Sequence, residues 1–203
     1  MLDFKKEQKE LYSPKTTPAI IDVGPMIFLA VDGMGDPNTS EEYVHAIEVL
    51  YGLSYAIKMG NKDILEYRVS PLEGFWSVIG FTSSAAIDKD QFVWTMAIRQ
   101  PEFVTEEILG QAKEKLTKKK PHLDTSRARL ESITEGLCVQ ALHIGPYDDE
   151  PATITQMESF AVENGHAMDV SAVRRHHEIY LGDPRKSAPE KLKTIIRLPI
   201  VYV

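Results

Sequence analysis

Apolar residues recur along the chain with helical spacing in two places. After residue 39 one stripe carries Tyr43, Ala46, Ile47, Leu50, Leu53 and Ile57. Thr39 followed by Glu42 forms a capping-box pattern, which predicts where this helix begins. A second helix is predicted from Thr153, and Asn164 with Gly165 predicts its end.

Runs rich in β-branched and aromatic residues predict strands around each helix. The first half has Met26–Val31, Ile64–Val69 and Phe92–Ile98, and the second has Cys138–Ile144, His176–Leu181 and Thr194–Tyr202. A glycine-containing turn follows the first strand of each set. Both halves therefore read strand, turn, helix, strand, strand, and this order predicts an internal repeat.

The repeat predicts the organisation of all 203 residues. We expect one α+β domain of tandem duplicated strand-helix-strand-strand modules, with antiparallel sheets around a central ligand cleft. The first pseudo-repeat covers about 20–100 and the second about 122–203. A connector helix is predicted at about 102–121, because two glutamates occupy its first turn and a proline follows it. Residues 1–18 are predicted to be a polar tail or strap.

Charge and cysteine usage exclude several classes of protein. The net charge of −7 argues against a nucleic-acid partner, which needs clustered Lys and Arg. The single cysteine, Cys138, excludes an intramolecular disulfide and suits a reducing compartment. No apolar run reaches the length of a membrane span or a signal peptide. We expect a cytoplasmic protein with a small-molecule partner, and the oligomeric state stays open.

Histidine spacing argues against a metal site. His176 and His177 are adjacent, so in a strand their side chains point to opposite faces. His143 and His166 lack a recognisable ligand spacing. Phosphate-loop, dinucleotide and serine-nucleophile motifs are absent from the sequence as well. We therefore expect neither a metal nor a cofactor.

A carboxylate in the middle of a predicted strand is the main candidate for chemistry. Glu178 shares one face of that strand with His176 and Tyr180. Such a group is unfavourable unless it is solvated, paired or functional. Glu178 is therefore either a site residue or one half of a cross-strand ion pair with Arg197, and the residues alone leave both interpretations open.

Aromatic residues of the first repeat supply flat surfaces. Trp76 follows Gly74 in a turn-like segment, and Trp94 lies within a predicted strand. These two indoles could form the walls of a ligand site, although tryptophan is more often a core residue. Tyr55 lies on a neighbouring face of the first helix and either packs or contacts a ligand.

Several motifs, in order, resemble those of the GyrI-like small-molecule-binding proteins. They are Pro71–Trp76 (PLEGFW), Trp94–Thr105 (WTMAIRQPEFVT), Glu135–Glu150 (EGLCVQALHIGPYDDE), His176–Arg185 (HHEIYLGDPR) and Lys193–Pro199 (KTIIRLP). The resemblance covers nearly the whole chain and implies the duplicated fold with a central cleft. No helix-turn-helix is appended, so the chain resembles the stand-alone members rather than the transcription regulators.

The resemblance implies a cleft for flat, lipophilic, often cationic compounds, with a glutamate at its base between aromatic walls. Some stand-alone members of such families hydrolyse cyclopropane-bearing electrophilic toxins. The glutamate is best matched by Glu178 and the walls by Trp76 and Trp94. Tyr147 and Tyr180 are weaker matches.

Our leading hypothesis is a metal-independent hydrolase that detoxifies cyclopropane-type electrophiles. Glu178 would act as general base, and Tyr180 or Tyr147 would hydrogen-bond the oxygen that gains charge. The remaining expected ligand contacts are Trp76, Trp94, Tyr55, Tyr67, His143 and His176. The alternative is a non-catalytic multidrug-binding protein or sensor of lipophilic cations, with Glu178 as counter-ion. A topoisomerase-binding module follows from the family name alone.

Overall fold

The computed structural model describes residues 1–78, 89–183 and 186–203 and shows helices combined with antiparallel sheet. The chain divides into two compact units. Unit 1 comprises Met1–Asp3 and Met26–Ile133, and unit 2 comprises Phe4–Pro25 and Thr134–Val203. The expected α+β class is confirmed.

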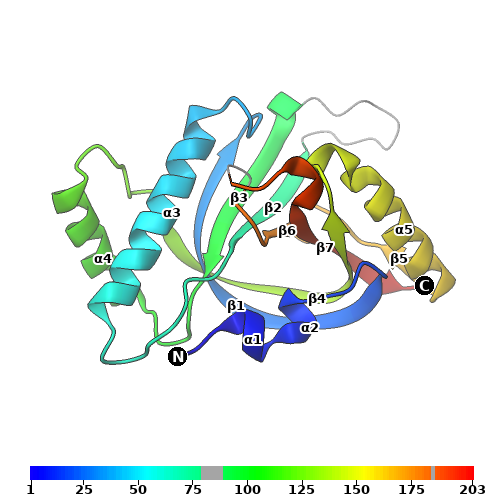
Figure 1. Ribbon diagram of the computed structural model, residues 1–203, viewed down its shortest axis with the longest axis horizontal. Helices are drawn as coiled ribbons and strands as arrows, with labels where there is room; N and C mark the ends of the chain where they lie inside the picture. Colours follow the sequence, from blue (N-terminus) through cyan, green and yellow to red (C-terminus); the bar gives the residue numbers. More distant parts are fainter. Residues whose placement is uncertain (79–88, 184–185) are drawn as a thin grey trace. The chain divides into compact units, whose positions relative to one another are not determined.

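Unit 1 is built on a sheet with β3 at its centre. The strand β3 (Phe92–Arg99) is antiparallel to both β1 (Ala19–Met34) and β2 (Leu72–Val78). The long helix α3 (Glu41–Gly60) packs against β3 and against α4 (Glu106–Lys119) (Figure 1). A short 3-10 turn, η1 (Lys89–Gln91), leads into β3.

Both helices of unit 1 occupy the stretches in which they are predicted. The stripe of α3 is buried at Ala46, Leu50, Leu53 and Ile57. The residue that caps this helix is Ser40 rather than Thr39, because the Ser40 hydroxyl accepts from the Tyr43 amide at 3.2 Å. Thr105 caps α4 in the same way, accepting from the Ile108 amide at 3.3 Å. The helix α4 lies inside the range expected for the connector.

One strand of unit 1 lies later in the chain than predicted. The segment Ile64–Val69 contains only an isolated parallel bridge from Tyr67 to Leu2. The second strand is instead β2, which the sequence analysis took to be turn-like. Pro71 and Gly74 suggested a turn, but a proline just before a strand removes no ladder hydrogen bond.

Unit 2 is built on β7 (Lys193–Tyr202). This strand is antiparallel to β4 (Arg129–Ile144), β5 (His166–Met168) and β6 (His176–Tyr180). The helix α5 (Glu150–Glu163) packs on the sheet through Met157 and Ala161, against Val139, Ala141, Ile196 and Leu198.

The helix α5 begins at Glu150, three residues before the predicted Thr153. It follows the 3-10 turn η2 (Tyr147–Asp149), and Pro151 fits its first turn because that position needs no amide donor. A second 3-10 turn, η3 (Pro189–Lys191), precedes β7.

The N-terminal segment belongs to unit 2 and is docked rather than a free tail. It forms two short helices, α1 (Phe4–Glu7) and α2 (Lys9–Tyr12). Tyr12 is 1% exposed and packs with Ile179 and Ile195. The Leu142 amide also donates to the Lys15 carbonyl at 2.9 Å.

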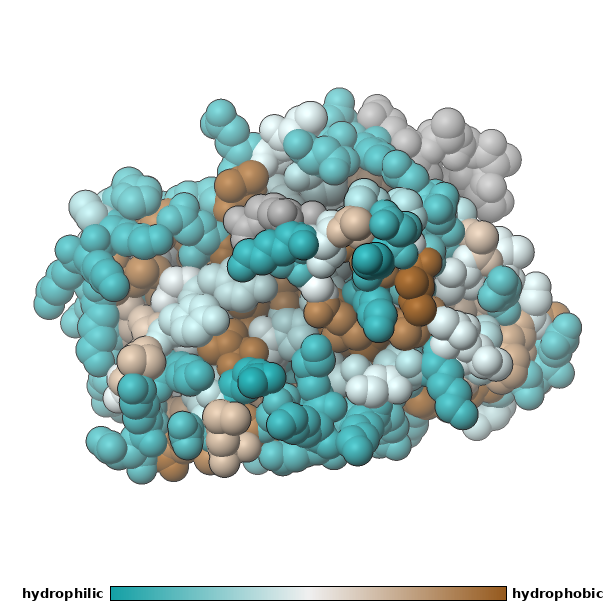
Figure 2. All heavy atoms as spheres, in the orientation of Figure 1, coloured by the Kyte–Doolittle hydropathy of each residue, from teal (hydrophilic) through white to brown (hydrophobic). Residues whose placement is uncertain are grey.

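Unit 1 thus follows the order strand, helix, strand, strand, and unit 2 follows it with the short strand β5 added after its helix; in both the last strand is paired on both sides. This is the order predicted by the repeat, while duplication itself and a central cleft stay predictions. No helix among the described residues is long and apolar enough to cross a bilayer. The face shown in Figure 2 is mainly hydrophilic, with apolar side chains exposed between polar ones.

Candidate functional site

The strand β6 presents its side chains as the sequence predicts. His177 and Ile179 are fully buried on one face, whereas His176, Glu178 and Tyr180 are partly buried on the other. The alternation follows from strand geometry, in which successive side chains point to opposite faces.

Both oxygens of Glu178 have a neighbouring donor. The Tyr180 hydroxyl donates to Oε2 at 2.7 Å, and His176 Nε2 lies 2.9 Å from Oε1. The Glu178 side chain is only 13% exposed and that of His176 is 20% exposed. Hydrogen bonds that are donated to a carboxylate favour its ionised form.

A second glutamate, Glu150, completes the site from the first turn of α5. It is 7% exposed, and its carboxyl group lies beside that of Glu178, with ligand atoms of the two within 4.8 Å of each other. Its Oε1 atom has no hydrogen-bond partner among the described residues. Two carboxyl groups in buried contact cannot both be ionised, so they share a proton.

The surroundings determine which glutamate holds that proton. Burial, with the charge of Glu178, raises the pKa of Glu150 to about 9. Burial also acts to raise the pKa of Glu178, but the hydrogen bonds from His176, Tyr180 and Glu150 outweigh it and leave that pKa below its ordinary value. At neutral pH the pair therefore consists of a neutral Glu150 and an ionised Glu178.

Two tyrosines border the glutamate pair. The rings of Tyr147 and Tyr180 meet edge to face, with centroids 5.8 Å apart. Burial, together with the charges of Glu150, Glu178 and Asp183, raises the pKa of Tyr147 to about 12. The Tyr147 hydroxyl therefore stays protonated and can donate a hydrogen bond. Tyr147, Tyr180 and His176 are thus the predicted residues that gather around Glu178.

Glu150 is absent from the site residues predicted from the sequence. This residue ends a run of three acidic residues after a turn, and such a run is typical of a solvated first turn of a helix. Its burial beside Glu178 results from tertiary packing. A weak signal was its place at the end of the family motif Glu135–Glu150.

The same residues include a set of possible metal-binding atoms. Glu150, His176 and Glu178 each offer one atom, and these atoms lie within 4.8 Å of one another. The sequence spacing could not reveal this set, because its members come from α5 and β6. Hydrogen bonds and the shared proton already satisfy Glu178 in the observed arrangement.

Arg197 is not the partner of Glu178, so the structure excludes the cross-strand ion pair, which is one of the two interpretations left open by the residues alone. In the β6–β7 register Glu178 lies opposite Ile196, whereas Arg197 lies opposite His177. Arg197 therefore shares the buried face of His177 and binds Glu135 at 2.9 Å.

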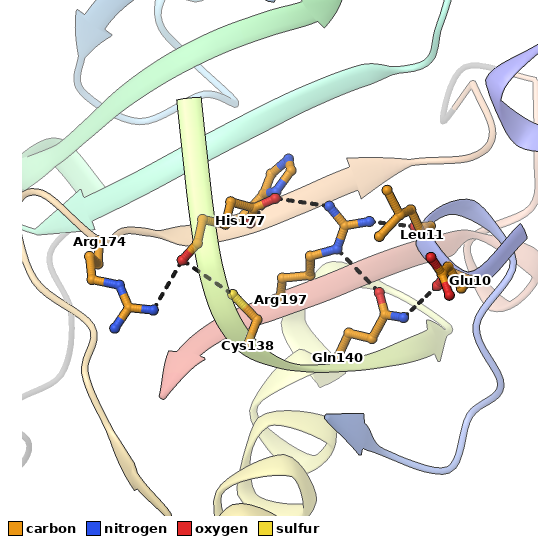
Figure 3. Close-up of polar contacts among 8 residues, drawn as sticks. Glu10, Leu11, Cys138, Gln140, Arg174, His177 and Arg197 are labelled. Carbon is orange, nitrogen blue, oxygen red and sulfur yellow. Dashed lines mark hydrogen bonds and ion pairs between the residues drawn. The ribbon is translucent and has the colours of Figure 1, made fainter. Parts of the chain in front are cut away.

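The network around Arg197 is structural (Figure 3). His177 Nδ1 lies 2.8 Å from Glu135, and Arg197 also donates to Gln140 at 3.2 Å and to the Leu11 carbonyl at 2.5 Å. Although burial opposes it, the charges of His177 and Arg197 lower the pKa of Glu135 to about 2. This network ties the N-terminal segment to β4, β6 and β7.

The structure places Trp94, which the sequence analysis considered as a possible wall of a ligand site, in the core of unit 1. Its side chain is fully buried and meets the edge of Tyr43 from α3, with ring centroids 5.3 Å apart. Its ring lies flat on Gly33, where an added Cβ would come within 2.0 Å of it. Trp94 is a core residue because α3 covers this face of the sheet.

Trp76 lies directly opposite Trp94 in the β2–β3 ladder and is only partly buried. Its ring centroid is 6.2 Å from that of Tyr43 and 5.7 Å from that of Phe92. Trp76 thus belongs to the same aromatic cluster of unit 1, with some surface left exposed.

The other three predicted ligand contacts have separate surroundings. Tyr67 is 1% exposed against Phe103, and Tyr55 is 53% exposed on α3. His143 contacts the Thr153 hydroxyl at 2.9 Å and the Pro146 carbonyl at 3.0 Å. His143 therefore holds the turn that leads into α5, where it positions the segment that carries Glu150.

Comparison with known proteins identifies the class to which this α+β chain belongs. The sequence profile of the GyrI-like small molecule binding domain matches residues 16–201. The chain belongs to this family, and it is a small-molecule-binding domain.

Solved structures of similar proteins agree. An uncharacterised conserved protein from Listeria innocua is 48% identical, with a TM-score of 0.93 over 99% of this chain and 100% of its own. A hydrolase from the same organism is 46% identical, with a TM-score of 0.91 over the same shares. The C-terminal domain of EcmrR shares only the fold, at 12% identity and a TM-score of 0.54 over 92% of this chain and 98% of its own. No curated protein matches the sequence.

Proposed function

We propose that this protein is a hydrolase that opens strained, electrophilic rings by adding water, with cyclopropane-bearing toxins as substrates. The observation that carries the proposal is the buried pair formed by ionised Glu178 and neutral Glu150. Two carboxyl groups with different pKa values in one site are the usual arrangement for paired base and acid catalysis. The hydrolases from Listeria innocua, at 46% and 47% identity, support the reaction type.

The reaction begins with a water molecule beside Glu178. The water oxygen bonds to the strained ring carbon while Glu178 accepts a proton from it. The carbon–carbon bond breaks, and its electron pair moves into a conjugated carbonyl, whose oxygen takes the proton of Glu150. Glu178 then returns its proton to Glu150 through their hydrogen bond.

The neighbouring side chains have supporting parts in this reaction. Tyr180 holds the Glu178 carboxylate in place through its hydrogen bond, and His176 Nε2 lies 2.9 Å from the other oxygen. Tyr147, which remains protonated, can donate to the oxygen that gains charge.

Replacing either glutamate tests the proposal. Glu178→Gln should reduce turnover of a cyclopropyl-dienone by about 100- to 10,000-fold, because general-base catalysis is worth that much. Glu150→Gln should reduce this turnover by only about tenfold. Ring opening of the dienone turns its carbonyl oxygen into a phenolate, which is a weak base and gains little from protonation by Glu150. The readout is product formation by mass spectrometry, and Glu158→Gln, an exposed glutamate on the same helix, is the matched control.

Two results would contradict this mechanism. Equal turnover by wild type and Glu178→Gln would remove the general base. Loss of turnover after treatment with EDTA, restored by a divalent cation, would show that the three donor atoms near Glu178 act through a metal.

A second candidate function is binding of lipophilic cations without chemistry. It is favoured by the ionised state of Glu178 at a side chain only 13% exposed, because a buried carboxylate attracts a counter-ion. Here Glu178→Gln weakens binding of a cationic dye, and the recovered dye keeps its mass. Wild-type protein that binds the dienone and returns it unchanged would favour this function over hydrolysis.

A further inference from the structure

The glutamate pair offers a proton donor and a proton acceptor side by side. The Tyr180 hydroxyl donates to one oxygen of Glu178 at 2.7 Å and His176 Nε2 lies 2.9 Å from the other, so these neighbours hold the group in place as an acceptor for a further proton. The Oε1 atom of Glu150 has no hydrogen-bond partner among the described residues, although the residue is only 7% exposed. A buried polar atom without a partner is unfavourable, and it is available to bind a polar atom of a ligand.

The arrangement does not require a carbonyl group in the substrate. In a ring that contains an oxygen, the ring oxygen can accept the proton of Glu150. A cyclopropane has no such atom, so the electron pair of the broken bond must move to a carbonyl oxygen elsewhere in the substrate.

We propose that the same site hydrolyses aryl epoxides to vicinal diols, with Glu150 as acid toward the ring oxygen and Glu178 as base toward water. This inference rests on the proposed function in taking Glu178 as the general base. It adds a second class of substrate. Hydrolysis of this class should depend more strongly on the acid Glu150 than ring opening of a cyclopropane does.

The step balances within the site. The water oxygen forms a bond to the benzylic carbon, and the carbon–oxygen bond of the ring breaks with its electron pair on oxygen. Glu150 gives that oxygen a proton while Glu178 takes one from the water. Proton return from Glu178 to Glu150 restores the starting state, so the reaction consumes one water and no other reagent.

The two substrate classes differ in how much they need the acid. Opening an epoxide without protonation produces an alkoxide, which resembles hydroxide from water of pKa about 15.7. Opening a cyclopropyl-dienone produces a phenolate, the group whose pKa in tyrosine is about 10. The more basic leaving oxygen gains more from a general acid.

The surroundings favour an aryl substituent. Tyr147 and Tyr180 meet edge to face at 5.8 Å beside the glutamates, and Tyr147 is 37% exposed. The exposed part of the Tyr147 ring offers an aromatic contact beside the pair.

The experiment measures hydrolysis of styrene oxide by wild type, Glu150→Gln, Glu178→Gln and the control Glu158→Gln. We expect wild type and the control to form phenylethanediol above the buffer rate. Glu150→Gln should lose at least about 100-fold on styrene oxide but only about tenfold on the dienone. Equal losses on both substrates, or no diol from a wild-type protein that turns over the dienone, would overturn this inference and leave the proposed function intact. A wild type that turns over neither substrate contradicts both.

A single turnover of wild type in H₂¹⁸O tests the role of Glu178 without any variant. Direct attack by water places ¹⁸O in the first diol and leaves the mass of the protein unchanged. If Glu178 instead attacks the ring, the first diol carries ¹⁶O and the protein gains ¹⁸O, which would overturn the assignment of Glu178 as base.

Discussion

At the scale of single residues, the proposed function of Glu150 conflicts with the stability of the fold. A carboxyl group that must be protonated to be buried lowers the stability of the fold at neutral pH. Its pKa is about 9 in the folded chain, against an ordinary value of 4.5. The folded state therefore binds more protons than the unfolded state between these values, and stability falls as pH rises through this window.

Glu150→Gln should stabilise the protein while it weakens the proposed reaction. Glutamine keeps the shape and needs no proton, so at pH 8 the variant should be more stable by at least about 1 kcal/mol, the equivalent of one pKa unit. Urea unfolding at pH 5 and pH 8 measures this, with Glu158→Gln as the control. The gain should be larger at pH 8, and a variant less stable than wild type at that pH would contradict the assigned protonation.

The sequence predicted half of this pair and could not predict the rest. Strand alternation placed Glu178 with His176 and Tyr180, because period-two geometry is local. Glu150 joins them only through the packing of α5 beside β6 and β7, and sequence spacing contains no record of that contact. The sequence left the pairing of Arg197 with Glu178 open for the same reason, since the register of β7 decides which face Arg197 takes.

Among elements, the contact of α3 with the β3–β2 face decides the role of the tryptophans. The sequence shows the stripe of α3 and the strand of Trp94, but not which face of that strand the helix covers. It also missed β2, because a proline and a glycine near its start mimic a turn.

Trp94→Ala should therefore behave as a core truncation. We expect a loss of about 3–5 kcal/mol in the free energy of unfolding, because the cavity under Tyr43 cannot collapse fully. Trp76→Ala, its cross-strand neighbour, should lose less, about 1–2 kcal/mol, since part of its surface stays exposed. Chemical denaturation measures both, and a smaller loss for Trp94→Ala than for Trp76→Ala would contradict the core assignment.

For the whole molecule, the buried Glu135–Arg197 pair should control resistance to acid. The pKa of Glu135 is about 2 in the folded chain and about 4.5 ordinarily. Its contribution is thus complete above pH 4.5 and is lost as pH falls toward 2. This loss is of the order of 3 kcal/mol, from 1.36 kcal/mol per pKa unit.

In the variant Glu135→Gln, the free energy of unfolding should fall less steeply as the pH is lowered. The variant should also be less stable at pH 7 by about 3–5 kcal/mol, because Arg197 remains buried without its charge partner. Urea midpoints at pH 7, 5 and 3 measure both effects, with Glu163→Gln, an exposed residue of α5, as the control. An acid response as steep as that of wild type would exclude Glu135 as its source.

The hydrogen bond from Arg197 to the Leu11 carbonyl joins residues 186 positions apart, and this separation bears on biosynthesis. Residues 26–133 of unit 1 are continuous in the sequence, whereas unit 2 combines residues 4–25 with residues 134–203 and is complete only after β7 has been synthesised. At about 5–20 residues per second, Leu11 waits roughly 10–40 s for Arg197. During that time the N-terminal segment, with Tyr12, lacks the core residues Ile179 and Ile195 that later bury it, so it is open to chaperones and proteases.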